Sequence, residues 1–222
     1  MNTECIITID GPSGVGKGTV AQYLCDQTGF HLLDSGAIYR SLAYGVLKNN
    51  LSAENLPGLV TLAENLPVRF EAGAVYYENE DITAQIRTET TAATASKIAT
   101  IAEVRAALLK RQKDFAQPPG LIADGRDMGT VVFTHAPVKF FLTASAEERA
   151  KRRLNQLKNQ GVGVNIRQIT QDIKERDERD RNRKTSPLLP APDALIIDTT
   201  HLSISQVCEL AMKAIRQKGL IE

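Results

Sequence analysis

The residues from Gly11 to Thr19, GPSGVGKGT, combine four glycines with a lysine directly after a short apolar run. Glycine lets a backbone turn with positive φ and pass close to a ligand, so consecutive N–H groups can face an anion. A helix that begins near Lys17 would add its positive end, and the lysine would add a point charge. The alternative is a glycine-rich turn with a solvated lysine, which the strand and helix expected on either side argue against. The segment therefore predicts a phosphate-binding loop.

The spacing GxxxxGK is the P-loop pattern, and the candidate nucleotide contacts are Gly11, Pro12, Ser13, Gly14, Val15, Gly16, Lys17, Gly18 and Thr19. One position departs from the usual pattern, because Gly18 follows the lysine and the hydroxyl comes one residue later, at Thr19. The GKGT form resembles nucleoside-monophosphate kinases more than GTPases or motor ATPases. We expect ATP as phosphate donor, with Mg²⁺ that keeps most of its waters and contacts Thr19 weakly.

A second group of polar residues, LLDSGAIYR, follows another apolar run. Asp34 or Ser35 could cap a helix that begins here, and Ser35 and Tyr39 would then share one face of it. Arg40 lies about one turn inside the same helix. A plain cap explains Ser35 as well as a ligand contact does, and a solvated arginine is the alternative for Arg40. This group of residues is a candidate binding site for the molecule that accepts the phosphate.

The segment IADGRDMGT has the same form, with an acid at the end of an apolar run and Asp124, Arg126 and Asp127 close together. Charges gathered at a strand end are costly unless they are paired or face a ligand. The planar fork of arginine suits phosphate because it binds two oxygens at once. Pairing of Arg126 with Asp124 or Asp127 is the structural alternative.

The run KERDERDRNR, residues 174–183, places Arg176, Asp180 and Arg183 at i, i+4 and i+7. These three side chains would share one helix face, where two cations flank one acid and leave positive charge unbalanced. The other charges of the run form i, i+4 pairs, which are typical of a solvated face. The run is therefore a further candidate for contacts to an anionic ligand.

Strands and helices that could position these residues alternate along the chain. The candidate strands are apolar runs of four to six residues at 5–10, 31–34, 121–124, 138–143 and 194–198. Helical periodicity falls at 17–28, 37–48, 103–116, 146–159, 166–183 and 204–218. Non-alternating apolar runs indicate strands that are buried on both faces. We predict an α/β fold with a doubly wound, five-stranded parallel sheet.

Residues 51–90 interrupt this alternation. They contain Pro57 and Pro67, and the segment VRFEAGAVYYENED alternates apolar and polar residues around Ala72 and Gly73. That pattern predicts an antiparallel hairpin, followed by a short helix at about 92–101. We therefore expect a small inserted subdomain.

Composition narrows the class of protein. The 222 residues carry 27 Lys and Arg against 26 Asp and Glu, a net charge of +1, which disfavours a general nucleic-acid surface. The three cysteines, Cys5, Cys25 and Cys208, have no metal-ligand or disulfide-framework spacing, so we expect buried thiols in a reducing compartment. No signal peptide or apolar run of about 20 residues occurs, which predicts a soluble, cytoplasmic protein without membrane contact.

Taken together, these segments resemble the bacterial cytidylate kinase family from end to end, with ATASK at 93–97 and the enlarged insert included. The resemblance implies that Ser96, Arg105 and Asp127 read cytosine and that Arg176 and Asp180 hold the sugar hydroxyls. It implies that Arg40, Arg126 and Arg183 clamp the acceptor phosphate beside Ser35, Tyr39 and Asp124. Lys17 and the loop would hold ATP, so the catalytic set is Lys17, Arg40, Arg126 and Arg183.

The domain plan implied by the resemblance is one P-loop kinase domain over 1–222. Its core would span 1–50, 103–147 and 184–222, the monophosphate-binding insert about 51–102, and a helical lid with the Arg-rich helix about 148–183. The lid carries Arg149, Lys151, Arg152 and Arg153, with Gly161 and Gly163 as possible hinges. Each of these basic residues either contacts ATP or belongs to a solvated cationic helix face, and the sequence leaves both alternatives open.

The implied activity is ATP-dependent phosphorylation of CMP and dCMP by a monomer, through charge neutralisation and positioning without a covalent intermediate. Another small-metabolite P-loop kinase is the nearest alternative. A nucleotide-gated RNA-binding module is the alternative from another class, although residues 147–184 contain no aromatic residue on which bases could stack. Residues 147–184 hold 12 basic and 7 acidic residues, whereas residues 51–90 hold 2 basic and 7 acidic ones. The near-neutral total is thus the sum of two opposed patches.

Overall fold

Two compact units make up the chain. The computed structural model describes residues 5–71, 73–159, 163 and 165–221. The first unit comprises Met1–Leu33 with Phe115–Glu222, and the second unit comprises Asp34–Asp114. Each unit buries apolar residues of its own, for example Phe140 in the first and Leu59 in the second.

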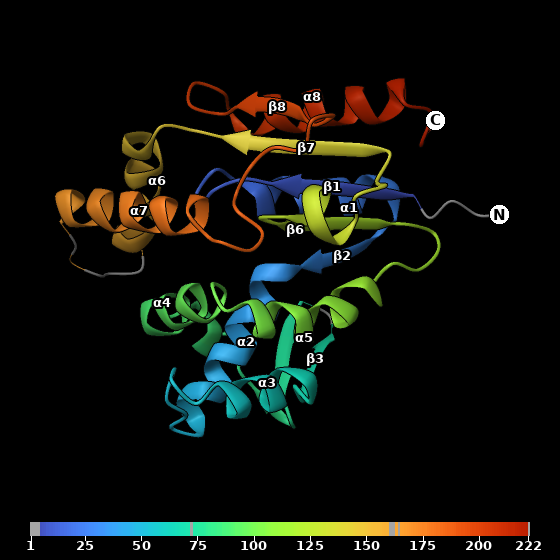
Figure 1. The fold of residues 1–222 in the computed structure, drawn as a ribbon. Helices are drawn as coiled ribbons and strands as arrows, with labels where there is room; N and C mark the ends of the chain where they lie inside the picture. The colour runs from blue at the N-terminus through green and yellow to red at the C-terminus, as the bar shows by residue number, and fades with distance from the viewer. Residues whose placement is uncertain (1–4, 72, 160–162, 164, 222) are drawn as a thin grey trace. The chain divides into compact units, whose positions relative to one another are not determined.

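A five-stranded sheet organises the first unit. Its strands are β1 (Ile6–Asp10), β2 (His31–Asp34), β6 (Leu121–Gly125), β7 (Val138–Thr143) and β8 (Leu195–Asp198). They lie in the order β2-β6-β1-β7-β8 (Figure 1). The pairs β1–β6, β1–β7 and β7–β8 are parallel, with Ile9 opposite Asp124 on one side and Phe140 on the other. The five predicted strands and the α/β class are confirmed, and the carboxyl ends of β1 and β6 meet at one edge.

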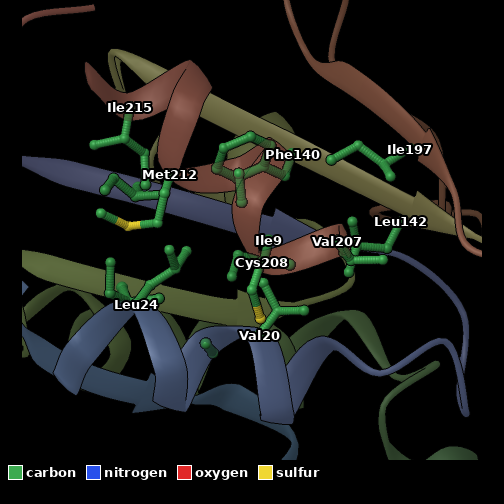
Figure 2. Packing of buried hydrophobic residues seen from close by; sticks show 14 of the residues in the cluster. Ile9, Val20, Leu24, Phe140, Leu142, Ile197, Val207, Cys208, Met212 and Ile215 are labelled. Carbon is green, nitrogen blue, oxygen red and sulfur yellow. The ribbon is translucent and has the colours of Figure 1, made fainter. Parts of the chain in front are cut away.

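The helices of this unit are α1 (Lys17–Thr28), α6 (Ala146–Asn159), α7 (Ile166–Arg181) and α8 (Ile204–Gln217), with a π-helical turn η2 (Met128–Val132). Helices α1 and α8 pack against each other and against the sheet. Their apolar faces meet Ile9 and Phe140 in the core, where Leu24 of α1 faces Met212 of α8 (Figure 2). This core fixes the strand ends that carry the candidate site.

Helices α6 and α7 form a hairpin with a small core of its own. Ala150, Leu157 and Ile169 are buried there, and Leu154 and Ile173 pack against them. The ribbon shows the two helices lying side by side (Figure 1). Helix α7 ends at Arg181, two residues before the predicted end, and the N–H of Asn182 closes it on Glu178. The expected hinge at Gly161 lies outside the described residues.

The second unit contains α2 (Ser35–Lys48), α3 (Leu56–Glu64), β3 (Val68–Glu71), β4 (Ala74–Tyr77), β5 (Glu80–Asp81), η1 (Gln85–Arg87), α4 (Glu89–Ile98) and α5 (Ala102–Lys113). The predicted hairpin is confirmed, because β3 and β4 pair antiparallel with Val68 opposite Tyr77 and Phe70 opposite Val75. Its turn residue Ala72 lies outside the described residues. The predicted helix at 92–101 is present as α4 but begins three residues earlier, since Thr88 caps it.

Helix α3 was not expected from the sequence. Pro57 was interpreted as an interruption, but it occupies the first turn of the helix, where no backbone N–H donor is needed. The side chain of Asn55 caps this turn by accepting from the N–H of Gly58 at 3.0 Å. The insert therefore contains a capped helix in addition to the expected hairpin.

The predicted insert limits at 51–102 stay a prediction. The second unit is wider, at Asp34–Asp114, because α2 packs on α4 and α3 packs on α5. Among the described residues, no helix is long and apolar enough to cross a membrane. The expectation of three buried thiols is wrong in part, since Cys208 is buried whereas Cys5 and Cys25 are half-buried.

Candidate active site

The loop between β1 and α1 has the backbone that its glycines make possible. Gly11, Gly14 and Gly16 have φ values of 146°, 78° and 94°. A Cβ atom on Gly11 would overlap the carbonyl oxygen of Leu142 in β7, so no larger residue fits there. Helix α1 begins at Lys17 directly after this loop. The strand, loop and helix context expected for a phosphate-binding loop is therefore present.

Lys17 is buried in this loop, with 7% of its surface exposed. Its Nζ donates to the carbonyl oxygen of Pro12 at 3.0 Å and lies 3.8 Å from Oδ1 of Asp124 at the end of β6. Burial lowers the pKa of Lys17 to about 8, and the positive charges of Arg126 and Arg176 lower it as well, against the attraction of Asp124. Lys17 thus lies in a buried cluster that contains both arginines and carboxylates, and its own positive charge is disfavoured there.

Arg126 lies between β6 and η2 and donates from Nε to Oδ2 of Asp180 at 3.0 Å. This partner comes from α7, whereas Asp124 and Asp127 were the partners considered from the sequence. Arg183 also pairs with Asp180, through Oδ1. Arg183 follows the end of α7, so the predicted i, i+7 face is wrong in detail, but Arg183 and Asp180 still meet.

Asp180 is the acid that Arg126 and Arg183 share, and only 3% of it is exposed. Burial alone would raise the pKa of its carboxyl, but the charges of Arg126, Arg183 and Arg176 outweigh burial and hold that pKa below its ordinary value. One carboxylate thus faces three arginines. An arrangement of three arginines around one carboxylate is compatible with an anionic ligand, and the predicted ligand contacts of these residues stay a prediction.

Asp10, the last residue of β1, was not singled out in the sequence. Its two carboxylate oxygens accept from the backbone N–H groups of Met128 and Gly129, both at 2.8 Å. These bonds tie the start of the phosphate-binding loop to the residues that follow Arg126 and the buried Asp127. Burial raises the pKa of Asp10 to about 7. An acid at the end of a buried strand, the signal used for Asp124, would have identified it.

In the second unit, the first turn of α2 presents Ser35 at its start, and the half-buried Arg40 follows within the helix. Asp34 is the cap, because its Oδ1 accepts from the N–H of Ala37 at 2.9 Å. Ser35 is buried and donates to Oε1 of Gln112 on α5 at 2.8 Å. The alternative of Ser35 as a plain cap is therefore wrong. Gln112, which is 2% exposed, was missed because a helical glutamine has no signal in the sequence.

Tyr39, Ser96 and Arg105 are buried in the same unit. The guanidinium of Arg105 lies 5.6 Å from the ring centre of Tyr39 and donates to the carbonyl oxygen of Ala99 at 3.2 Å. The Ser96 hydroxyl is buried and has no hydrogen-bond partner among the described residues. A buried hydroxyl without a partner is costly in a protein interior and indicates a place where a ligand donates or accepts.

The basic residues of α6 differ from one another. Arg149 is buried, Arg152 and Arg153 are half-buried, and Lys151 is exposed and pairs with Glu148. Arg152 donates to the carbonyl oxygen and the hydroxyl of Thr199 at 2.6 and 3.2 Å. The solvated cationic face proposed as an alternative therefore does not describe Arg149.

No group of three or more His, Cys, Asp or Glu side chains suited to a metal ion occurs in the part of the chain that the structure describes. Thr19, the predicted magnesium contact, is exposed in the first turn of α1. A single exposed hydroxyl beside a phosphate-binding loop fits a Mg²⁺ ion that arrives with a nucleotide and keeps its waters.

Known proteins resemble this chain closely. The profile of the family described as Cytidylate kinase matches residues 7–217. The cytidylate kinase of Colwellia psychrerythraea is 57% identical over 207 residues, which cover 91% of this chain and 92% of that one. The cytidylate kinase of Shewanella pealeana is 52% identical and covers 96% and 95% of the two chains. The cytidylate kinase of Marinomonas sp. is 51% identical, and the match covers both chains completely.

Proposed function

Because the chain belongs to the cytidylate kinase family, we propose that it transfers the γ-phosphate of ATP to CMP or dCMP. The products are ADP and CDP or dCDP. The observation that carries this proposal is the buried Lys17 at the start of α1, which is close enough to Arg126 and Arg176 for their charges to lower its pKa. Like charges gathered in a buried site are stabilised by a polyanion, and a nucleoside triphosphate supplies one.

The transfer is a direct displacement. An oxygen of the CMP phosphate forms a bond to the γ-phosphorus while the bond to the bridging oxygen of ADP breaks. The attacking oxygen is already anionic near pH 7, so the protein needs no general base. Lys17 and the N–H groups of the loop neutralise the donor phosphates, and Arg40, Arg126 and Arg183 are the residues assigned to the acceptor phosphate.

Thr19 would be the protein contact of a Mg²⁺ ion that arrives with ATP, and the ion would supply positive charge that neutralises the donor phosphates. The surrounding residues contribute by holding the phosphate-binding side chains in position. Asp180 holds Arg126 and Arg183 at fixed angles before a substrate enters, so less orientation is lost on binding.

Recognition of the acceptor base and sugar is a further part of the proposal. Ser96, Arg105 and Asp127 are proposed to read cytosine, which offers an amine donor and the acceptors O2 and N3. The hydroxyl of Ser96, buried without a partner among the described residues, supports this assignment. Arg176 and Asp180 are proposed to bind the sugar hydroxyls, while Ser35, Tyr39 and Asp124 line the acceptor site.

A coupled assay of ADP release with CMP, dCMP, UMP, AMP and GMP tests the proposal. We expect turnover with CMP and dCMP at least about tenfold above the other acceptors, because a site shaped to hydrogen-bond cytosine leaves buried polar groups unpaired when another base enters. The Lys17→Met variant is the control for contaminating kinases and should be inactive. Equal rates with all acceptors, or no ADP release with any, would refute the proposal.

Residence in the cytoplasm and a monomeric state are further parts of the proposal. Membership of the cytidylate kinase family favours nucleotides as the partners of this chain. Sedimentation of the purified chain at assay concentration would test the monomer directly.

A further inference from the structure

Three carbonyl oxygens of the phosphate-binding loop are each held by a side chain. Pro12 accepts from Nζ of Lys17 at 3.0 Å, and Ser13 accepts from Nη1 of Arg149 at 3.1 Å. Val15 accepts from the hydroxyl of Thr199 at 3.3 Å. Two of these donors, Arg149 and Thr199, lie far from the loop in sequence and outside the GxxxxGK pattern.

The direction of a carbonyl fixes the direction of the N–H that follows it. A trans peptide is planar, so its C=O and N–H groups point to opposite sides of the chain. A bond from Arg149 to the oxygen of Ser13 therefore turns the N–H of Gly14 the opposite way. In the same way, the bond from Thr199 to the oxygen of Val15 orients the N–H of Gly16. Gly14 and Gly16, which have positive φ, lack a Cβ atom, so the rotation of their peptides is less restricted than that of other residues.

Arg149 is itself held rigidly. It is 2% exposed and donates from Nε to the carbonyl oxygen of Ala144 at 3.1 Å. Both terminal nitrogens bond the two carboxylate oxygens of Asp177 on α7, with Nη1 at 3.0 Å from Oδ1. Such a two-pronged pair is among the most directional contacts of arginine. The guanidinium can therefore hold the Ser13 oxygen in one place.

Thr199 has a matching support. It is 2% exposed, and Arg152 of α6 donates to both its carbonyl oxygen and its hydroxyl. Both supports of the loop from outside thus depend on residues in the first half of α6. The base of the α6–α7 hairpin and the loop form one hydrogen-bonded assembly within the first unit.

We propose that Arg149, braced by Asp177, and Thr199, braced by Arg152, are positioning residues that preorganise the N–H groups of Gly14 and Gly16 for the phosphates of ATP. Neither side chain needs to touch ATP to do this. The proposal rests on the proposed function only in taking ATP as the ligand of the loop. It assigns Arg149 a role different from the ATP contact that its place in the lid suggests.

Binding of ATP, measured by calorimetry without an acceptor, tests the proposal in Arg149→Lys, Asp177→Asn and Thr199→Val. Lysine keeps the charge but lacks the planar fork whose three nitrogens bond Ala144, Ser13 and both oxygens of Asp177, and valine replaces only the hydroxyl with a methyl group. We expect ATP to bind about tenfold more weakly to each variant, with CMP affinity changed less than about twofold. Glu147→Gln is the matched control, because the exposed Glu147–Lys174 pair joins the same two helices without reaching the loop. Its ATP affinity should equal that of the original chain.

Amide resonances of the loop separate positioning from a general loss of structure. On addition of ATP, Arg149→Lys should lose most of the shift of the Gly14 N–H and keep that of Gly16, and Thr199→Val should show the reverse. Affinity within twofold of the original in all three variants, or equal changes of both amides in each, would overturn the proposal. If Arg149→Lys and Asp177→Asn unfold, the ATP affinity and amide shifts of Thr199→Val alone test the proposal. A chain that binds ATP as expected but does not phosphorylate CMP contradicts the proposed function alone.

Discussion

Lys17 sits where its own charge is disfavoured, and this makes it sensitive to its ligand. Burial and the neighbouring arginines lower its pKa to about 8, so a growing share of it is neutral as the pH rises above that value. A bound phosphate stabilises the protonated form and moves the pKa upward again. The same residue therefore links ATP binding to proton uptake.

We predict that ATP binding takes up about half a proton at pH 8 and close to one proton at pH 9. Since protons bind with ATP, the affinity for ATP must fall as pH rises through this range, by up to about tenfold per unit. Calorimetry in two buffers with different ionisation enthalpies measures the uptake directly. The phosphates of ATP are fully ionised in this range, so uptake comes from the protein. An affinity that stays constant to about pH 9 would show that Lys17 remains charged in the free protein.

At the scale of elements, the loop between β1 and α1 shows why glycines in one motif are not equivalent. Gly11 has a φ of 146° and faces the Leu142 carbonyl, whereas Gly18 is already in α1. A Cβ atom on Gly18 would lie 3.7 Å from the Asp124 carboxylate, an ordinary contact. Gly11 is required because β7 approaches its backbone closely, whereas packing does not require a glycine at position 18.

We predict opposite effects of alanine at these two positions. Gly11→Ala should lower the free energy of unfolding by about 3 kcal/mol or more, because it combines a strained φ with a clash against backbone. Gly18→Ala should raise it by about 0.5–1 kcal/mol, since alanine favours a helix. Urea unfolding followed by circular dichroism measures both. A loss of stability in Gly18→Ala would mean that the first turn of α1 needs glycine for another reason.

At the scale of the whole molecule, stability of the first unit depends on the core between its sheet and the α1–α8 pair. Phe140 lies in the middle of β7 and is 1% exposed, with Ile9 and Val207 in the same cluster (Figure 2). Ile196, on the neighbouring strand β8, is 57% exposed. The two side chains thus belong to paired strands but differ in burial.

We predict that Phe140→Ala lowers the free energy of unfolding by about 3–5 kcal/mol, because it removes a large buried side chain and leaves a cavity. Ile196→Ala is the matched control and should cost less than about 1 kcal/mol. Equilibrium urea unfolding of both variants provides the comparison. Similar costs for the two would indicate that β8 is covered in solution.

The charge distribution also belongs to this scale. The basic excess of residues 147–184 falls in the first unit, and the acidic excess of residues 51–90 falls in the second. Two ion pairs lie within residues 147–184, Arg149 with Asp177 and Arg183 with Asp180, and since each joins one basic to one acidic residue they leave the excess unchanged. The net charge of +1 is therefore a sum over two segments of opposite charge and does not represent the charge of either one.

Much of the fold could be predicted because its signals are local. Short apolar runs that end in acids or small polar residues identified the five strands, and Thr28, Asn159 and Lys48 are the observed ends of helices predicted from periodicity. Pro57 was misjudged because a proline interrupts most elements yet suits a helix start. Gln112 was missed because its partner, Ser35, lies far away in sequence, whereas Asp10 carried the same strand-end signal as Asp124 and was overlooked.

The sequence by itself determined the phosphate-binding loop, since its glycines and Lys17 act within a few residues of one another and no distant partner is needed to recognise them. It also indicated the family, through motifs that stand in the right order. Only the tertiary structure decided that Arg126 pairs with Asp180 and that Arg149 holds the loop from outside. Those contacts join residues 54 and 136 positions apart. Spacing along a chain carries no information about such pairs, because packing of the sheet and helices sets the distance between them.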